Sequence, residues 1–223
     1  MSVQLIAMLT NHDKTVPDAP EVFENNKDAK TSCWGFKDVG VELPVAKKLV
    51  EAMKKEGKTT FMEPLIESEE GCLEAAQFAI DCGFDYVIGT MFYPSVAEKL
   101  KGTGIKYFPT CGKRAGIPRM LYGTIDSIID DAKRILAYDG VDGISLSVYR
   151  YVDGDPEEMA LKFRESIQEP IMVTGSISND ERLKFVTNMK PWGFTIGSAL
   201  FDDSFGHFDK ISEKLDFIQE KLG

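Results

Sequence analysis

The sequence predicts an α/β protein folded as a (β/α)8 barrel, the TIM-barrel architecture, in a single domain spanning residues 1–223. Eight apolar segments alternate with eight amphipathic segments along the chain. The apolar segments are near-continuous hydrophobic runs, which is typical of parallel strands covered on both faces. No glycine-rich loop follows the first apolar segment, as it often does in an open doubly wound sheet, so a closed barrel is favoured. No linker or change of composition divides the chain.

The expected elements follow one another in strict alternation. Strands are expected at 3–10, 32–38, 59–65, 85–91, 105–110, 142–148, 170–175 and 192–197. Helices are expected at 18–28, 43–56, 68–82, 94–101, 124–138, 155–167, 178–189 and 207–222. Three glycines, Gly83, Gly140 and Gly193, stand near the ends of helix patterns, where a left-handed residue leads into the next strand. The longest irregular stretch, residues 110–123, is expected to be a mobile loop after the fifth strand.

Local signals support individual helices. Residues 43–56 and 124–138 place apolar side chains three and four positions apart, with a polar opposite face. The helix at 155–167 begins with an aspartate that can cap it and a proline at the first helical position. The helix at 178–189 begins with Ser178 as the expected cap, and acidic residues follow in its first turn.

The composition excludes several classes of function. Acidic residues outnumber basic ones by 36 to 26, which gives a formal net charge of −10 and disfavours nucleic acid as a partner. The first residues lack the basic region of a signal peptide and the long apolar run of a membrane span. We therefore expect a cytoplasmic protein without a membrane partner. The four scattered cysteines are expected to be reduced thiols.

Two Gly-Ser pairs close the last two expected strands. Gly175-Ser176 ends the segment PIMVTGS, and Gly197-Ser198 ends the segment WGFTIGS. In a barrel, the loops after strands seven and eight lie side by side at the C-terminal rim, where a phosphate often binds. Glycine lets the backbone approach an anion closely, and the serine hydroxyls add hydrogen-bond donors. The pattern predicts a phosphate site, and the alternative is that the pairs serve only as turns and caps.

The eight-unit layout, with VTGSIS and FTIGSALF near its end, resembles the phosphate-binding (β/α)8-barrel superfamily of aldolase-type TIM barrels. That superfamily includes ribulose-phosphate epimerases, barrels of histidine and tryptophan biosynthesis, sugar-phosphate decarboxylases and glycerol-responsive antiterminator proteins. The resemblance implies a small phosphorylated ligand. It selects no reaction, because one fold hosts many activities.

Charged residues near the ends of the second and third strands are candidates for catalysis. Lys37 and Asp38 follow an apolar run, and Glu63 lies within the next one. A charge inside an apolar strand is costly unless it is paired or functional. If Lys37 and Glu63 both face the barrel mouth, they can act as an acid/base pair, with Asp38 contacting substrate. The alternative is a structural salt bridge, and Lys37 and Asp38 cannot both point inward from a regular strand.

Cations in the later loops are candidates for binding anions. Lys113 and Arg114 follow the fifth strand, and Lys113 is expected to stabilise an oxyanion. Arg150 follows the sixth strand and is expected to bind substrate or phosphate. The alternative for Lys113 and Arg114 is a solvated basic loop. The alternative for Arg150 and its neighbour Tyr149 is packing of the aromatic edge at the barrel rim.

These features predict an enzyme that acts on a small phosphorylated metabolite by lyase or isomerase (epimerase) chemistry based on proton transfer. A quinolinate-type phosphoribosyltransferase and a non-catalytic sensor similar to the glycerol-responsive antiterminators are the alternatives. No cofactor is required by this chemistry, although Asp38 and Glu63 leave a divalent cation such as Mg²⁺ open. Association into a homo-oligomer also remains open.

Overall fold

The central sheet of the computed structural model, which describes residues 3–116 and 118–222, has eight parallel strands in the order β10-β11-β12-β1-β4-β5-β6-β7. The strands are β1 (Gln4–Met8), β4 (Cys33–Phe36), β5 (Thr59–Met62), β6 (Tyr86–Ile88), β7 (Lys106–Phe108), β10 (Ile144–Leu146), β11 (Ile171–Val173) and β12 (Gly193–Ile196). Backbone hydrogen bonds also join β10 and β7, the first and last strands in this order. Asp142 N–H donates to the Tyr107 carbonyl and Ser145 N–H donates to the Pro109 carbonyl, both at 2.9 Å. The sheet therefore closes, and the predicted (β/α)8 barrel is confirmed.

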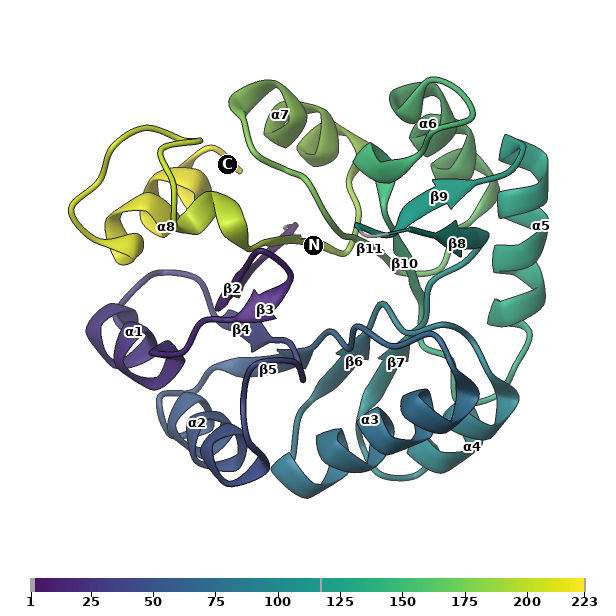
Figure 1. Cartoon of the computed structure of the whole chain (residues 1–223). Helices are drawn as coiled ribbons and strands as arrows, with labels where there is room; N and C mark the ends of the chain where they lie inside the picture. The colour runs from purple at the N-terminus through teal and green to yellow at the C-terminus, as the bar shows by residue number, and fades with distance from the viewer. Residues whose placement is uncertain (1–2, 117, 223) are drawn as a thin grey trace.

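The helices surround the strands as an outer ring (Figure 1). They are α1 (Ala19–Asn26), α2 (Leu43–Lys55), α3 (Glu69–Cys82), α4 (Pro94–Leu100), α5 (Ile125–Leu136), α6 (Pro156–Ser166), α7 (Asp180–Met189) and α8 (Ile211–Glu220). The expected order of strands and helices is confirmed, and most boundaries differ by one to three residues. Within the described residues, no helix combines the length and apolar character needed to cross a bilayer.

Aromatic side chains fill the N-terminal end of the barrel. Phe61, Ile88, Phe108 and Met172 are buried inside it, and Tyr86 and Trp192 pack against them at the start of their strands. The rings of Tyr86 and Trp192 lie 5.2 Å apart. The side chains of parallel strands form layers inside a barrel. Since apolar side chains fill the layers at the N-terminal end, polar side chains can gather at the C-terminal rim.

Two short β-hairpins occur where the sequence predicted a loop or a longer strand. Residues 110–123, expected as a mobile loop, contain β8 (Lys113–Ala115) paired with β9 (Met120–Tyr122). The expected first strand, 3–10, ends early, and β2 (Thr10–Asn11) pairs with β3 (Lys14–Thr15). Short antiparallel pairs of this kind depend on contacts with the barrel beneath them, which local sequence signals do not reveal.

Some local signals were assigned to the wrong position. The cap of α7 is Asn179, whose side chain accepts from Arg182, and not Ser178. Gly193 is the first residue of β12, where a Cβ atom would come within 2.9 Å of the Gln4 carbonyl oxygen of β1. Close approach of two strands therefore explains this glycine, whereas Gly83 does occupy the expected left-handed position at the end of α3.

Candidate active site

A cavity of about 330 Å³ opens at the C-terminal ends of the barrel strands. The polar and charged side chains that line it are Thr10, Asp13, Lys37, Glu63, Arg150, Ser176, Ser178, Arg182, Thr195, Ser198 and Asp202. The backbones of Gly175 and Gly197 also line it. Both predicted phosphate turns and the predicted acid/base pair therefore lie around one space, although they come from distant parts of the sequence.

The turn after β11 is built around two consecutive left-handed residues, Gly175 (φ 78°) and Ser176 (φ 62°). Arg182, in the first turn of α7, donates to the Ser176 carbonyl at 2.6 Å. The Arg182 guanidinium also lies over the Tyr149 ring, 4.5 Å from its centre. These contacts hold the turn in a conformation that a non-glycine residue such as Ser176 rarely adopts.

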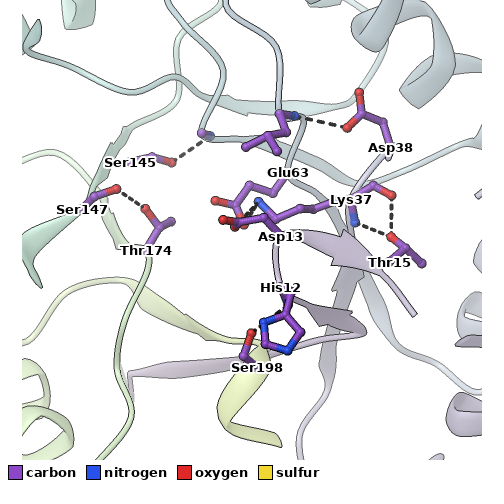
Figure 2. A network of polar contacts seen from close by, with 12 residues as sticks. His12, Asp13, Thr15, Lys37, Asp38, Glu63, Ser145, Ser147, Thr174 and Ser198 are labelled. Atoms are coloured by element: carbon purple, nitrogen blue, oxygen red, sulfur yellow. Dashed lines mark hydrogen bonds and ion pairs between the residues drawn. The ribbon is translucent and has the colours of Figure 1, made fainter. Parts of the chain in front are cut away.

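The turn after β12 contains Gly197 and a short 3-10 helix, η2 (Ser198–Leu200). The Ser198 hydroxyl oxygen accepts a hydrogen bond from the His12 backbone N–H at 3.1 Å (Figure 2). The hydroxyl hydrogen therefore remains available to donate to a ligand. The helix η2 begins directly after Gly197.

Lys37 lies between two carboxylates in the barrel mouth. Its Nζ atom is 3.4 Å from Glu63 Oε2 and 3.6 Å from Asp13 Oδ1, and the Lys37 side chain is only 6% exposed. Figure 2 shows both acidic side chains pointing toward the end of the Lys37 side chain. The structure thus brings the predicted pair of Lys37 and Glu63 together. Both side chains are close enough to contact the same ligand in the cavity.

Asp13 reaches this position because the β2–β3 hairpin folds over the rim. Its turn has positive φ at His12 (48°) and Asp13 (60°), as a type I′ turn requires. Thr15 fastens the hairpin to the barrel by donating to the Lys37 carbonyl at 2.7 Å and accepting from the Lys37 N–H at 2.9 Å. Asp13 Oδ1 also lies 3.6 Å from Arg150 Nη2, so one carboxylate oxygen is shared by two cations.

Two predicted site residues do not reach the cavity. Asp38 turns away from Lys37 and accepts from the Leu65 N–H at 3.2 Å, while burial raises the pKa of its carboxyl. Lys113 is exposed on β8. Side-chain alternation explains both results, because Lys37 and Arg114 take the inward positions next to them. Glu63 lines the cavity, whereas Asp38 does not.

Arg114 is the residue that β8 contributes near the barrel mouth. Its Nη1 donates to Thr110 Oγ1 at 3.1 Å. Burial lowers the pKa of the Arg114 guanidinium to about 10, and the nearby positive charge of Arg150 acts in the same direction. Arg114 thus replaces Lys113 as the candidate for holding negative charge.

Three buried polar atoms near the mouth have no hydrogen-bond partner among the described residues. They are Thr10 Oγ1, Arg114 Nε and Arg150 Nε. Buried polar atoms are almost always paired in folded proteins, because an unpaired group loses its hydration without compensation. Two of the three residues, Thr10 and Arg150, line the cavity.

Sequence reasoning missed Asp13, Arg182 and Thr10 as parts of this site. Arg182 carried a usable signal, because a cation in the first turn of a helix opposes the helix dipole and suggests another role. Thr10 and Asp13 carried only their position at and just after the end of the first expected strand, since nothing local indicates that residues 10–15 form a hairpin over the rim.

No protein-family model matches the chain, and no curated protein sequence matches it. Solved structures with the same fold do. A structure of native KDPGal superposes with a TM-score of 0.69 and 13% identity, covering 100% of this chain and 97% of that one. Orotidine 5'-phosphate decarboxylase from Pyrococcus horikoshii OT3 gives a TM-score of 0.68 at 14% identity, covering 98% and 99%. N-(5'-phosphoribosyl)anthranilate isomerase from Pyrococcus furiosus gives 0.65 at 14% identity, also covering 98% and 99%.

These structures agree with the predicted resemblance to aldolase-type TIM barrels. The match extends over nearly the whole of both chains in each case. At such low identity, the likeness establishes the (β/α)8 fold alone. The activity of this chain has to be argued from its own cavity.

Proposed function

We propose that the protein is an enzyme that binds a small phosphorylated metabolite and transfers a proton next to a carbonyl, as lyases and isomerases do. The observation on which this proposal depends is the shared cavity. Ser176 and Ser198 line one side of it, and Lys37 and Glu63 meet at 3.4 Å within it. A phosphate anchored at the turns would hold the rest of a short ligand against this pair.

The phosphate would bind to the two turns and the cations beside them. Gly175 and Gly197 give an anion access to the backbone, and Ser198 has a hydroxyl hydrogen to donate. Arg150 and Arg182 line the same cavity and supply positive charge. A formal charge of −10 for the whole chain does not oppose this, because the field inside a cleft depends on the charges that line it.

Glu63 and Lys37 would divide the proton transfer between them. The Glu63 carboxylate takes a proton from the carbon next to the ligand carbonyl, and electrons move onto the carbonyl oxygen. The Lys37 ammonium stabilises that oxyanion and then returns a proton to it. Asp13 lies on the other side of Lys37, with its Oδ1 atom 3.6 Å from Lys37 Nζ.

Binding and chemistry can be tested separately with variants. Ser198→Asp places a negative charge in the phosphate site, and we expect at least a 100-fold loss of affinity for glycerol 3-phosphate, measured by calorimetry. Ser166→Asp, at the exposed end of α6 and outside the lining of the cavity, is the matched control and should bind normally. Unchanged affinity in Ser198→Asp would remove the phosphate site from the proposal.

The acid/base pair is tested by proton exchange. Sugar phosphates are incubated with the protein in heavy water, and deuterium at the carbon next to the carbonyl is followed by proton NMR. Glu63→Gln and Lys37→Met should slow exchange by about 100-fold or more while keeping ester affinity within a few-fold. Full exchange activity in both variants would show that the salt bridge is structural.

A second candidate function is phosphoribosyl transfer of the quinolinate type. The observation in its favour is the number of arginines near the mouth, namely Arg114, Arg119 and Arg150, whose charges act on one another. A diphosphate requires such a basic surrounding. Titration with phosphoribosyl pyrophosphate and Mg²⁺ distinguishes the two, because this candidate requires tighter binding of the diphosphate than of a simple ester.

A further inference from the structure

Thr10 is buried at the barrel mouth with a hydroxyl group that the fold does not use. Its side chain lines the cavity and the residue is only 5% exposed, yet Oγ1 has no hydrogen-bond partner among the described residues. In contrast, the buried hydroxyls of Ser147 and Thr174 pair with each other at 2.9 Å. An unpaired buried hydroxyl has lost its hydration without compensation, so a ligand that pairs with it recovers that loss.

The Thr10 side chain points into the barrel because of its place after β1. Ile6 and Met8, four and two residues before it, belong to the apolar cluster inside the barrel. Leu9, between them and Thr10, belongs instead to the cluster shared with the surrounding helices. Since successive side chains point to opposite faces of a strand, Thr10 continues the inward face above Met8, at the level of the cavity.

The strand register places Thr10 in one layer with the acid/base pair. Met8 of β1 pairs with Gly35 of β4, which lies two residues before Lys37. Gly35 in turn pairs with the residue of β5 that lies two positions before Glu63. Thr10, Lys37 and Glu63 therefore stand side by side at the C-terminal ends of three adjacent strands, and all three line the cavity.

The strand order also places Thr10 between the phosphate turns and the acid/base pair. The Gly-Ser turns follow β11 and β12, Lys37 and Glu63 follow β4 and β5, and β1 lies between these two pairs of strands. A Cβ atom on Gly197 would lie 3.1 Å from the Thr10 carbonyl oxygen, so Thr10 contacts the second turn directly. A ligand with its phosphate at the turns and its carbonyl at the acid/base pair has to pass Thr10.

We propose that Thr10 is a specificity-determining residue, whose hydroxyl forms a hydrogen bond with a hydroxyl group on the ligand chain between the phosphate ester and the carbonyl. The substrate class is then a phosphorylated hydroxycarbonyl compound, and the corresponding deoxy compound binds less well. Because Oγ1 has no partner within the described chain, the side chain can change rotamer toward the ligand without breaking a hydrogen bond. This inference rests on the proposed function, because it takes the phosphate to lie at the two Gly-Ser turns.

The test compares two phosphate esters that differ by one hydroxyl group. Glycerol 3-phosphate has a hydroxyl on its middle carbon, and 3-hydroxypropyl phosphate lacks only that group. Calorimetry on the wild-type protein should give about tenfold tighter binding of glycerol 3-phosphate, taken for its tighter-binding enantiomer. Inorganic phosphate is titrated alongside to measure the phosphate site alone.

Variants assign the preference to Thr10. Thr10→Val keeps the shape of the side chain without its hydroxyl, so the preference should fall below about twofold, with the affinity for 3-hydroxypropyl phosphate changed less than about threefold. Thr10→Ser keeps the hydroxyl and should keep the preference. Thr187→Val, in α7 and outside the lining of the cavity, is the matched control and should also keep it. Thermal unfolding verifies that each variant is folded, and Thr10→Ala takes the place of Thr10→Val if the latter is not.

The outcomes separate this inference from the proposed function. Equal wild-type affinity for the two esters would overturn the role of Thr10 and leave the phosphate site standing. Failure to bind inorganic phosphate and both esters would overturn the proposed function as well. A preference that survives in Thr10→Val would place the hydroxyl contact elsewhere, and an equal loss of affinity for inorganic phosphate and both esters would assign Thr10 to the phosphate. Either of these two results would overturn the inference.

Discussion

Gly175 shows how one residue can satisfy two requirements at once. Its φ of 78° falls in the left-handed region, where a side chain is strained. A Cβ atom there would also come within 2.8 Å of Arg150 Nε. The glycine therefore allows the turn to form and allows Arg150 to lie against it.

Replacing Gly175 with alanine should cost stability and binding together. We expect Gly175→Ala to lower the free energy of unfolding by about 2–3 kcal/mol, because left-handed strain adds to displacement of Arg150. The affinity for glycerol 3-phosphate should fall at least tenfold. Gly57→Ala is the matched control, since Gly57 has φ 71° but nothing within 4 Å of the added carbon. Its expected cost is about 1 kcal/mol, with no loss of affinity. Equal effects in both variants would contradict the role given to Arg150.

Asp13 should oppose the binding of an anion, because its carboxylate contacts Lys37 and Arg150. We expect Asp13→Asn to raise the affinity for inorganic phosphate by about three- to tenfold at low ionic strength, and less at high salt. Asparagine tolerates the left-handed turn conformation, so the hairpin should persist. The comparison is Asp130→Asn, on the exposed face of α5, which should leave the affinity unchanged. Weaker binding in Asp13→Asn would mean that Asp13 organises the cations more than it competes for them.

At the scale of elements, α8 supports the turn after β12 from outside the barrel. Lys214 of α8 is buried, and its Nζ atom donates to the carbonyls of Ala199 (3.4 Å), Leu200 (3.2 Å) and Asp202. These carbonyls belong to η2 and the residues that follow it. Ser198 is therefore positioned by a helix whose sequence contains no hint of a ligand.

Lys214→Met should leave those three carbonyls without their donor. We expect a loss of about 2 kcal/mol in the free energy of unfolding, since hydrogen bonds to a charged group are among the stronger ones. Ester affinity should also weaken several-fold, through the Ser198 turn. Lys210→Met, at the exposed start of α8, should change stability by less than about 0.5 kcal/mol. A stable Lys214→Met variant with normal affinity would show that η2 holds its own shape.

At the scale of the whole molecule, the barrel shields every cysteine. Cys33, Cys72, Cys82 and Cys111 are all buried. Burial raises the pKa of each thiol, to about 11 for Cys82 and about 12 for Cys111. A neutral buried thiol is a poor nucleophile.

Thiol reactivity should therefore report opening of the fold. At pH 8, a disulfide reagent such as Ellman's reagent should modify none of the four cysteines of the folded protein within minutes, and all four in denaturant. Any slow modification of the cysteines in the native protein should proceed through unfolding. A saturating phosphate ester should slow this modification further, because a ligand that binds only the folded state stabilises it. Fast modification of one cysteine in the native protein would contradict this expectation. It would show that the structure opens locally around that residue.

The sequence by itself determined the fold class, the order of the strands and helices, and the two Gly-Ser turns, because these depend on local hydrophobic patterns and on glycine at strand ends. It also pointed to Lys37 and Glu63, whose charges are conspicuous in apolar runs. Only the tertiary structure decided that Asp38 accepts from Leu65, that Lys113 is exposed and that Arg114 donates to Thr110. The side-chain direction in a short strand depends on register against its neighbours, which a local pattern does not specify. The positions of Asp13 and Lys214 could not be predicted from the sequence for a similar reason. They depend on contacts with residues far away in the chain, Lys37 for Asp13 and Leu200 for Lys214.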